Sequence, residues 1–286
     1  MNTANVLLPS PHIIRDAVRM ALEEDLGYGD LTTGATVPPD VEVEGVIIAR
    51  ASGVVAGLPV AREVFAELDR ALSFDEVVHD GAPVEPDDAI AEIYGSARAI
   101  LSGERVALNF LQQLSGVATA TRSIVEQLEG TQAVLLDTRK TVPGLRALQR
   151  YAVRVGGGSN HRFNLFDGVL IKENHIIAAG GIASALDRAR AAVGPFTPVE
   201  IEIERLDQLE GAIRHGADMI LLDNMTPDQM CEAVAIVNGR VKLEASGDIT
   251  IERAKVIAET GVDYLSSGAL THSAPALNLS LRLDAS

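Results

Sequence analysis

The chain has 286 residues, of which 47% are apolar and 22% charged, a balance that excludes disorder, collagen-like repeats and a disulfide scaffold. Its 24 basic and 40 acidic residues give a formal charge of −16, which disfavours nucleic acids and anionic membranes as partners. Cys231 is the single cysteine, so neither an intrachain disulfide nor a cysteine metal cluster can form. The chain lacks the ~18 uncharged apolar residues of a spanning helix and a signal-peptide pattern. We therefore expect a cytoplasmic protein.

The first third of the chain predicts a helix followed by strands. Ser10 and Pro11 are typical of a helix start, and the amphipathic pattern continues to the glycine at 27. Residues 41–94 are mostly strand-like, with a short helix around 60–68. Residues 97–129 predict two helices that meet near Ser115.

After residue 130 short apolar runs alternate with helical segments about six times, which predicts a parallel sheet covered by helices. The runs cover residues 133–137, 168–172, 199–204, 219–223, 241–246 and 262–268. Each run ends in polar residues. This favours a barrel over a doubly wound sheet, because barrel strands all end at one mouth. Only about six strands fit, so we expect the barrel to be incomplete. The terminal LNLSLRL could add one more strand to the N-terminal sheet.

Positive charge is concentrated between Arg139 and Lys172. This segment contains seven basic residues and a single acidic residue, Asp167. This net charge of +6 in an acidic chain indicates a pocket for a small, highly charged anion. The alternative is a solvated basic helix face, since three of the seven follow one another at intervals of four residues. These three are Arg146, Arg150 and Arg154.

Several candidate site residues follow the predicted strands. Arg139 and Lys140 suit carboxylates and phosphates. Lys172 ends a buried strand and needs an anion or an acidic neighbour, Glu173 or Glu202. Glu202 and Asp223 suit Mg²⁺ or sugar hydroxyls, or could pair internally with Lys140 or Lys172. The segments Ser246-Gly247-Asp248 and Ser267-Gly268 could bind phosphate at helix N-termini or could be simple turns. Three histidines are candidate ligands or proton carriers, although no zinc-binding motif joins them. They are His161, His175 and His272.

Segment 137–175, DTRKTVPGLRALQRYAVRVGGGSNHRFNLFDGVLIKENH, closely resembles the signature region of the quinolinate phosphoribosyltransferase family. EEDLGYGDLTT, SGERVALNFLQQLSGVATATR, ILLDN, LEASGDI and GVDYLSSGALTHS extend the likeness over nearly the whole chain in the same order. The resemblance implies an α/β fold, with an N-terminal α/β sandwich-like domain and a C-terminal incomplete parallel α/β barrel. We expect the domains at residues 1–113 and 114–276, with the tail from about 277 to 286 returning to the first.

The resemblance also implies a reaction: quinolinate and phosphoribosyl pyrophosphate give nicotinate mononucleotide, CO₂ and pyrophosphate, with Mg²⁺, in de novo NAD synthesis. It assigns the quinolinate carboxylates to Arg139, His161, Arg162 and Lys172, with Arg105 reaching in from the partner of a homodimer or an assembly of dimers. Lys140, Glu202 and Asp223 would serve ribose, pyrophosphate and metal. The phosphate end would be lined by Ser246, Gly247, Asp248, Ser267, Gly268 and His272. Asp248 stands where family members often have Gly or Asn, so we expect a backbone role there.

Four other functions compete with this one. A related molybdenum-transport-associated protein has a similar barrel but is expected to lack the lysine of LIKENH. A nicotinate phosphoribosyltransferase that does not decarboxylate would bind a single carboxylate. It would therefore need fewer cationic side chains than Arg139, Arg162 and Lys172 provide. A Schiff-base aldolase would use Lys172 as its nucleophile. An anion-binding regulatory module would bind quinolinate without turnover.

Overall fold

The computed structural model describes residues 6–284, which divide by their internal contacts into two units. Unit 1 holds the described residues up to 122, then 141–157 and those from 270 onward. Unit 2 holds residues 123–140 and 158–269. The boundary expected at 113/114 falls inside a continuous helix, α4 (Ala97–Gln127), and the domain limits remain a prediction.

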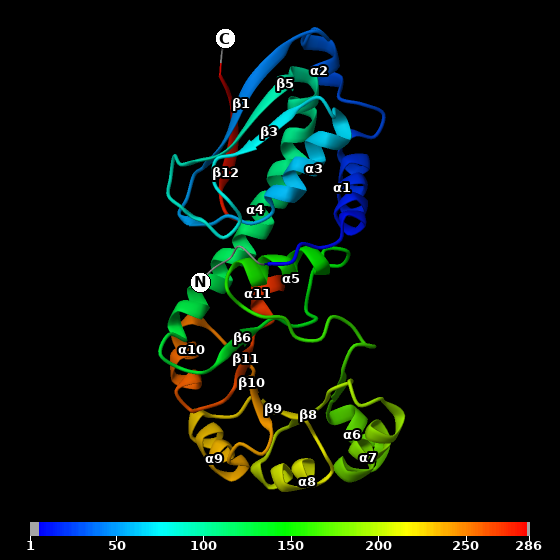
Figure 1. The fold of residues 1–286 in the computed structure, drawn as a ribbon, viewed down its shortest axis with the longest axis vertical. Coiled ribbons are helices and arrows are strands. Elements are labelled where there is room, and N and C mark those ends of the chain that lie inside the picture. The colour runs from blue at the N-terminus through cyan, green and yellow to red at the C-terminus, as the bar shows by residue number, and fades with distance from the viewer. Residues whose placement is uncertain (1–5, 285–286) are drawn as a thin grey trace. The chain divides into compact units, whose positions relative to one another are not determined.

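Unit 1 is built on a four-stranded antiparallel sheet in the order β12-β1-β5-β3 (Figure 1). Its members are β1 (Glu42–Ala49), β3 (Ser73–Glu76), β5 (Ala89–Ser96) and β12 (Leu279–Asp284). The last strand comes from the C-terminal tail and pairs with β1 from Leu279 opposite Ala49 onward. A small ribbon joins β2 (Gly53–Val54) to β4 (Pro83–Val84).

Helices supply the rest of the unit 1 core. The expected first helix is confirmed as α1 (Pro11–Leu26), with Ile14, Val18 and Leu22 buried. It packs against α3 (Leu58–Leu68), and the ion pairs Arg15–Glu63 and Arg19–Glu67 join the two. The remaining helices are α2 (Leu31–Thr36), α5 (Arg146–Val155) and, across the unit boundary, α11 (Ala269–His272).

The expectation of two helices over 97–129 is wrong, because α4 runs unbroken from Ala97 to Gln127. Ser115 and Gly116 lie inside this helix. A Cβ on Gly116 would lie 2.1 Å from the carbonyl oxygen of Pro275. The glycine therefore admits a close backbone neighbour, and its helix-breaking tendency is overridden by packing.

Unit 2 confirms the parallel sheet, with all six predicted strands in the order β6-β11-β10-β9-β8-β7. The strands are β6 (Val134–Leu136), β7 (Val169–Ile171), β8 (Val199–Ile203), β9 (Met219–Asp223), β10 (Lys242–Ser246) and β11 (Tyr264–Ser266). This is the cyclic order of a barrel, with β6 paired to β11. The described strands include no pairing of β6 with β7, so the barrel is open at that point.

The opening follows from the path of the chain after β6. Residues 141–157, including the predicted helix α5, belong to unit 1, so no helix of unit 2 links β6 directly to β7. The chain re-enters unit 2 at Gly158, and Ser159 forms a single parallel bridge to Leu136. Residues just after this bridge lie beside β6 at the open edge.

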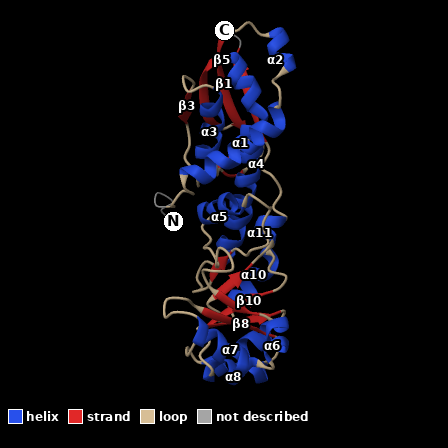
Figure 2. Cartoon of the chain, turned by 90° about the vertical axis from the view of Figure 1, so that its right-hand side faces the viewer, coloured by secondary structure: helices blue, strands red, loops and turns tan. Residues whose placement is uncertain are grey.

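The other helices lie on the outer side of the sheet (Figures 1 and 2). They are α6 (Glu173–Ala179), α7 (Ile182–Ala192), α8 (Leu209–Arg214), α9 (Pro227–Val237) and α10 (Ile251–Ala258), with a 3₁₀ turn at Leu206–Gln208. Of these five helices, only α6 was not expected from the sequence. Val199, Ile201 and Ile203 of β8 are buried, and strand alternation directs Glu200 and Glu202 to the opposite face.

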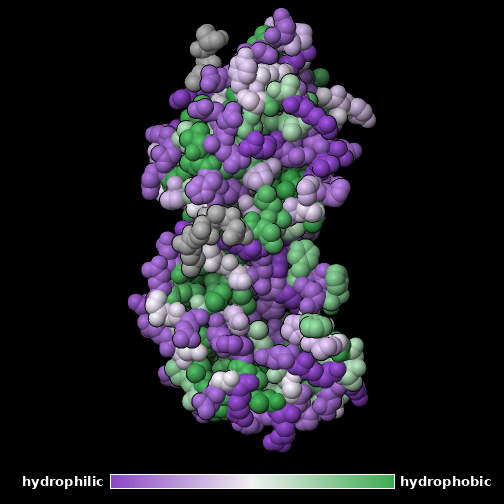
Figure 3. All heavy atoms as spheres, viewed as in Figure 1, coloured by the Kyte–Doolittle hydropathy of each residue, from purple (hydrophilic) through white to green (hydrophobic). Residues whose placement is uncertain are grey.

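The face shown in Figure 3 is mainly hydrophilic, in keeping with the charged composition. Within residues 6–284 no helix combines the length and the apolar character that crossing a membrane requires.

Candidate active site

A cavity of about 360 Å³ opens at the carboxyl ends of the unit 2 strands. Its walls combine four cationic side chains, three carboxylates and one imidazole with hydroxyl and apolar groups. The lining residues are Thr138, Arg139, Lys140, His161, Arg162, Leu170, Lys172, Glu202, Leu221, Asp223, Glu244, Ser246 and Ser266. We refer to it below as the barrel pocket.

The acidic and hydroxyl groups come from successive strands. Glu202 lies on β8, Asp223 ends β9, and Ser246 ends β10 in register with Asp223 and with Ser266 of β11. Parallel strands bring their carboxyl ends to one edge, so residues far apart in sequence meet there. The sequence identified Ser266 as a polar strand end, but it was not assigned to the site.

The cations come from the open side of the barrel. Arg139 and Lys140 follow β6, and Lys172 follows β7. Lys172 is not buried as expected: its side chain is 50% exposed, and its Nζ lies 2.5 Å from Oε2 of Glu202. The internal pairing left open by the sequence is therefore present. An anion binding beside Lys172 would compete with Glu202 for the ammonium group.

Two guanidinium groups repel each other in this pocket. Burial and the neighbouring Arg139 lower the pKa of Arg162. Placing like charges together is unfavourable unless an anion of opposite charge is bound between or beside them. The side chain of Arg162 is held in place by a 2.9 Å hydrogen bond from its Nη1 to the carbonyl oxygen of Gly168.

The turn Ser246-Gly247-Asp248 lies at the same edge. Gly247 has φ +104°, and a Cβ there would lie 2.1 Å from Oδ1 of Asn224, so no other residue fits without rearrangement. Asp248 has φ +47°, in the left-handed region that Gly and Asn adopt most readily. The turn precedes α10, which starts at Ile251.

Other predicted site residues are not among those that line the barrel pocket. Ser267 is buried, and its hydroxyl donates to the carbonyl oxygen of Ile249 rather than lining the barrel pocket. Gly268 follows it directly. Arg105, exposed on α4, and His272, at the end of α11, both belong to unit 1. The seven basic residues found between positions 139 and 172 are likewise divided between the two units. Three of them, Arg146, Arg150 and Arg154, lie on α5 of unit 1.

Two buried carboxylates lie beside His161, and sequence reasoning assigned neither a role in the site: Glu200 was missed, and Glu244 was identified only as a polar strand end. Its Nε2 lies 3.0 Å from Oε2 of Glu200 and 3.3 Å from Oε2 of Glu244. Within residues 6–284 these three form the group of potential metal ligands whose atoms all lie within 4.8 Å of one another. The alternation in VEIEI places Glu200 on the same face as Glu202, a signal that could have identified it.

His161 and Glu200 influence each other's pKa. Burial works to lower the pKa of His161, but the carboxylates of Glu200 and Glu244 outweigh it and raise that pKa to about 10. Burial in turn raises the pKa of Glu200. Three of the four carboxylate oxygens have no hydrogen-bond partner: Oε1 of Glu200 and both oxygens of Glu244.

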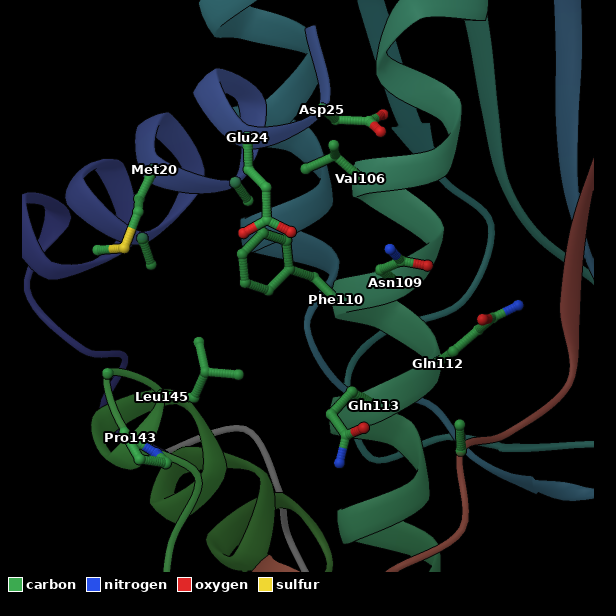
Figure 4. Close-up of a pocket in the computed structure, with 14 residues that line it drawn as sticks. Met20, Glu24, Asp25, Val106, Asn109, Phe110, Gln112, Gln113, Pro143 and Leu145 are labelled. Atoms are coloured by element: carbon green, nitrogen blue, oxygen red, sulfur yellow. The ribbon is translucent and has the colours of Figure 1, made fainter. Parts of the chain in front are cut away.

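A second cavity, of about 520 Å³, lies within unit 1 (Figure 4). Met20 and Glu24 reach it from α1, and Val106, Asn109 and Phe110 reach it from α4. Its fourteen lining residues include Glu24 and Asp25 but no basic side chain. We refer to it below as the unit 1 cavity.

Family models identify both parts of the chain. Residues 30–115 match the N-terminal domain of quinolinate phosphoribosyl transferase, and residues 117–282 match its C-terminal domain. The chain belongs to the quinolinate phosphoribosyltransferase family. The family expectation, which residues 137–175 carried most strongly, is thereby confirmed.

Individual members of the family align over nearly their whole length. A probable nicotinate-nucleotide pyrophosphorylase (carboxylating) of Bacillus subtilis is 45% identical over 260 residues, which cover 90% of this chain and 89% of the relative. The Mycobacterium leprae enzyme of that name is 45% identical over 275 residues, covering 94% and 96%. The solved Francisella tularensis nicotinate-nucleotide pyrophosphorylase has a TM-score of 0.93 at 41% identity, covering 98% of each chain.

Proposed function

We propose that this chain transfers the phosphoribosyl group of phosphoribosyl pyrophosphate to the ring nitrogen of quinolinate with loss of CO₂, giving nicotinate mononucleotide and pyrophosphate. The observation that carries the proposal is the barrel pocket, where Arg139, Lys140, Arg162 and Lys172 meet the carboxylates of Glu202 and Asp223. Both substrates are polyanions and fit such a cationic site in an otherwise acidic protein. The family relatives carry the names of this reaction and do not favour the molybdenum-transport alternative. A cytoplasmic location is part of the proposal.

The two carboxylates of quinolinate would be bound by Arg139, His161, Arg162 and Lys172, all of which line the barrel pocket. A guanidinium presents two parallel donors to a carboxylate, and Arg139 and Arg162 already lie close enough to repel each other. Lys172 would exchange its contact with Glu202 for the substrate. Clamping both carboxylates fixes the ring nitrogen toward the sugar, which is the main requirement of this chemistry.

Phosphoribosyl pyrophosphate would lie toward Lys140, Asp223 and the turn at 246–248. Glu202 and Asp223 offer the hard oxygen ligands that Mg²⁺ prefers, directly or through water. The side-chain amide of Asn224 donates a 2.9 Å hydrogen bond to Oδ2 of Asp223, and this contact orients the carboxylate. When bound, Mg²⁺ would supply positive charge to the pyrophosphate oxygens.

The side chains of the protein would stabilise charges that develop during the reaction rather than transfer protons. The pyridine nitrogen attacks C1 of the ribose as the C1–oxygen bond to pyrophosphate breaks, and Lys140 stabilises the departing anion. The carboxylates of Glu202 and Asp223 favour positive charge developing on the ribose. The C2–carboxylate bond then breaks to release CO₂. Its electron pair stays on C2 beside the positive nitrogen until C2 takes up a proton.

We propose further that the chain forms a homodimer or an assembly of dimers in which Arg105 serves the neighbouring subunit's site. The exposure of Arg105 on α4 supports this. Mixing Arg105→Ala with Lys172→Ala chains should restore part of the activity, because one site of the mixed dimer would carry both residues. Absence of complementation in confirmed mixed dimers would contradict the arrangement.

The function is tested by incubating the protein with quinolinate, phosphoribosyl pyrophosphate and Mg²⁺, with nicotinate as a parallel substrate. We expect equimolar CO₂ and nicotinate mononucleotide from quinolinate, and no nucleotide from nicotinate. Nucleotide from nicotinate without CO₂ would place the protein in the non-decarboxylating class. No product from either would favour an anion-binding role. Borohydride with a carbonyl substrate should trap no adduct at Lys172.

A further inference from the structure

A fully buried glutamine on α5, Gln149, joins two segments of unit 1 that are far apart in sequence. Its side-chain oxygen accepts a 2.9 Å hydrogen bond from the backbone amide of Val142. Its Nε2 donates a 2.6 Å hydrogen bond to the carbonyl oxygen of Thr271 on α11. Both functional groups of the side-chain amide are therefore used, each by a backbone group of the same unit.

Packing alone does not explain a polar side chain at this position. Seven of the ten residues of α5 are buried, and a helix that is buried on most of its sides is normally apolar there. An amide group withdrawn from water is costly unless its hydrogen bonds are replaced. A methionine would fill a similar space without that requirement. The glutamine at 149 therefore indicates that its two backbone contacts serve a purpose.

The contact with Val142 holds a short turn in front of α5. The carbonyl oxygen of Val142 accepts a 3.1 Å hydrogen bond from the amide of Leu145, with Pro143 and Gly144 between the two. Gly144 has φ +81°, and a proline followed by a glycine of positive φ is typical of a type II turn. Such a turn has little internal freedom, so a hydrogen bond to its first residue fixes the whole turn against α5.

Lys140, which lines the barrel pocket, lies two residues before this turn. On its amino side, the backbone amide of Lys140 donates a 3.0 Å hydrogen bond to the hydroxyl of Thr138. On its carboxyl side, the chain continues through Thr141 to Val142, whose amide is bound by Gln149. The backbone that carries Lys140 is therefore anchored within two residues on either side.

We propose that Gln149 is a positioning residue for Lys140 and acts through the backbone at Val142. The inference rests on the proposed function, in which Lys140 stabilises the departing pyrophosphate. A lysine has a flexible four-carbon side chain, so its backbone must hold it within reach of the anion. Because Gln149 also binds Thr271, the segment after Lys140 is fixed to both α5 and α11. Electrostatic stabilisation of a leaving group depends on this kind of preorganisation.

The test removes the amide group while keeping the length of the side chain. In Gln149→Met both hydrogen bonds are lost. We expect kcat to fall about tenfold and the KM for quinolinate to stay within about twofold of the unaltered value, because the displaced lysine acts on the leaving pyrophosphate. The 3.0 Å hydrogen bond from Nε of Arg146 to the hydroxyl of Thr141 still holds the segment. The loss should therefore be smaller than in Lys140→Ala.

Ser115→Ala is the matched control for the loss of buried backbone contacts. Ser115 is fully buried in unit 1, and its hydroxyl accepts from the amide of Ala56 at 3.0 Å and donates to the carbonyl oxygen of Ala56 at 3.3 Å. Both variants should have a lowered Tm. The kcat of Ser115→Ala should be unchanged at a temperature where the variant is folded, and equal losses of kcat in both would overturn the proposal. If Gln149→Met does not fold, Gln149→Asn takes its place, because its amide is one methylene group too short to reach both partners.

A double-mutant cycle shows whether the effect passes through Lys140. In a Lys140→Ala background, Gln149→Met should leave kcat/KM unchanged, because the positioned group is gone. A fully additive effect, or a Gln149→Met protein with unaltered kcat, would overturn the proposal.

Binding of pyrophosphate in the presence of Mg²⁺, measured by calorimetry, gives a readout that does not depend on turnover. We expect Gln149→Met to weaken this binding about tenfold and Ser115→Ala to leave it unchanged. Unaltered affinity in Gln149→Met, or no measurable binding by the unaltered protein, would overturn the proposal. If the unaltered protein fails to convert quinolinate, the proposed function fails, and the binding experiment still decides the role of Gln149.

Discussion

The barrel pocket and the unit 1 cavity are hollows of comparable size with opposite chemistry. The unit 1 cavity is the larger, at about 520 Å³ against about 360 Å³, yet none of its lining residues is basic. Four cations and three carboxylates line the smaller one. Binding of polyanionic substrates requires convergent charge, so the smaller hollow is the better candidate. Volume by itself is a poor guide to function in this protein.

The difference has a structural cause. The barrel pocket lies where six parallel strands end, and each strand end can contribute a polar side chain without disturbing the sheet. The unit 1 cavity lies along the sides of α1 and α4, where the amphipathic pattern places apolar groups such as Met20 and Phe110. The following predictions test whether function depends on the first region and stability on the second.

The largest effect is expected at Lys140 in the barrel pocket. Lys140→Ala should lower kcat/KM about 10²–10³-fold, because the pyrophosphate would leave without its cationic partner. Steady-state assays with quinolinate measure this. Lys255→Ala is the control, since Lys255 is an exposed lysine on α10 of the same unit. Equal losses in both variants would mean that overall charge, not the pocket, sets the rate.

A smaller effect is expected at the turn beside Asn224. Gly247→Ala should raise the KM for phosphoribosyl pyrophosphate about tenfold, because a Cβ and a positive φ displace the turn. Gly194→Ala is the matched control, since nothing lies within 4 Å of its Cβ position. An unchanged KM in Gly247→Ala would remove the turn from the proposed substrate site.

The unit 1 cavity should respond in stability alone. Phe110→Leu should lower the free energy of unfolding by about 1–2 kcal/mol, because a buried ring is replaced by a smaller side chain. Both KM values should stay as they were, as judged by assays at a temperature where the variant is folded. Met20→Leu, at a side chain that is 65% exposed, is the control for α1. A large change in KM with Phe110→Leu would break the contrast between the two regions.

The smallest effect is expected at the start of α2 in unit 1. Hydrogen bonds from the hydroxyl and amide of Thr33 lower the pKa of Asp30. A lowered pKa means that the ionised group stabilises the fold above its unfolded pKa of about 3.9, and that this contribution is lost as the pH falls through the folded value. The difference in Tm between the unaltered protein and Asp30→Asn should therefore be constant near neutral pH and shrink below about pH 4. A difference that grows on acidification would contradict the assignment.

Much of the fold was predictable because its signals are local. The alternation of short apolar runs and helical segments identified all six strands of unit 2, and Ser10-Pro11 marked the first helix. The two helices expected over 97–129 were wrong, since Gly116 serves a close contact with Pro275, distant in sequence. A single sequence does not distinguish a glycine that breaks a helix from one that admits a neighbour.

The candidate site shows the same division. The sequence by itself determined which charged residues end the strands, because strand boundaries and residue types can be read locally, and it identified the family. Only the tertiary structure decided that Lys172 is half exposed beside Glu202, that α5 belongs to unit 1, and that His161 faces Glu200 and Glu244. Each of these depends on which groups meet from segments tens of residues apart. Hydrogen bonds and ion pairs between such segments form only once the chain has packed.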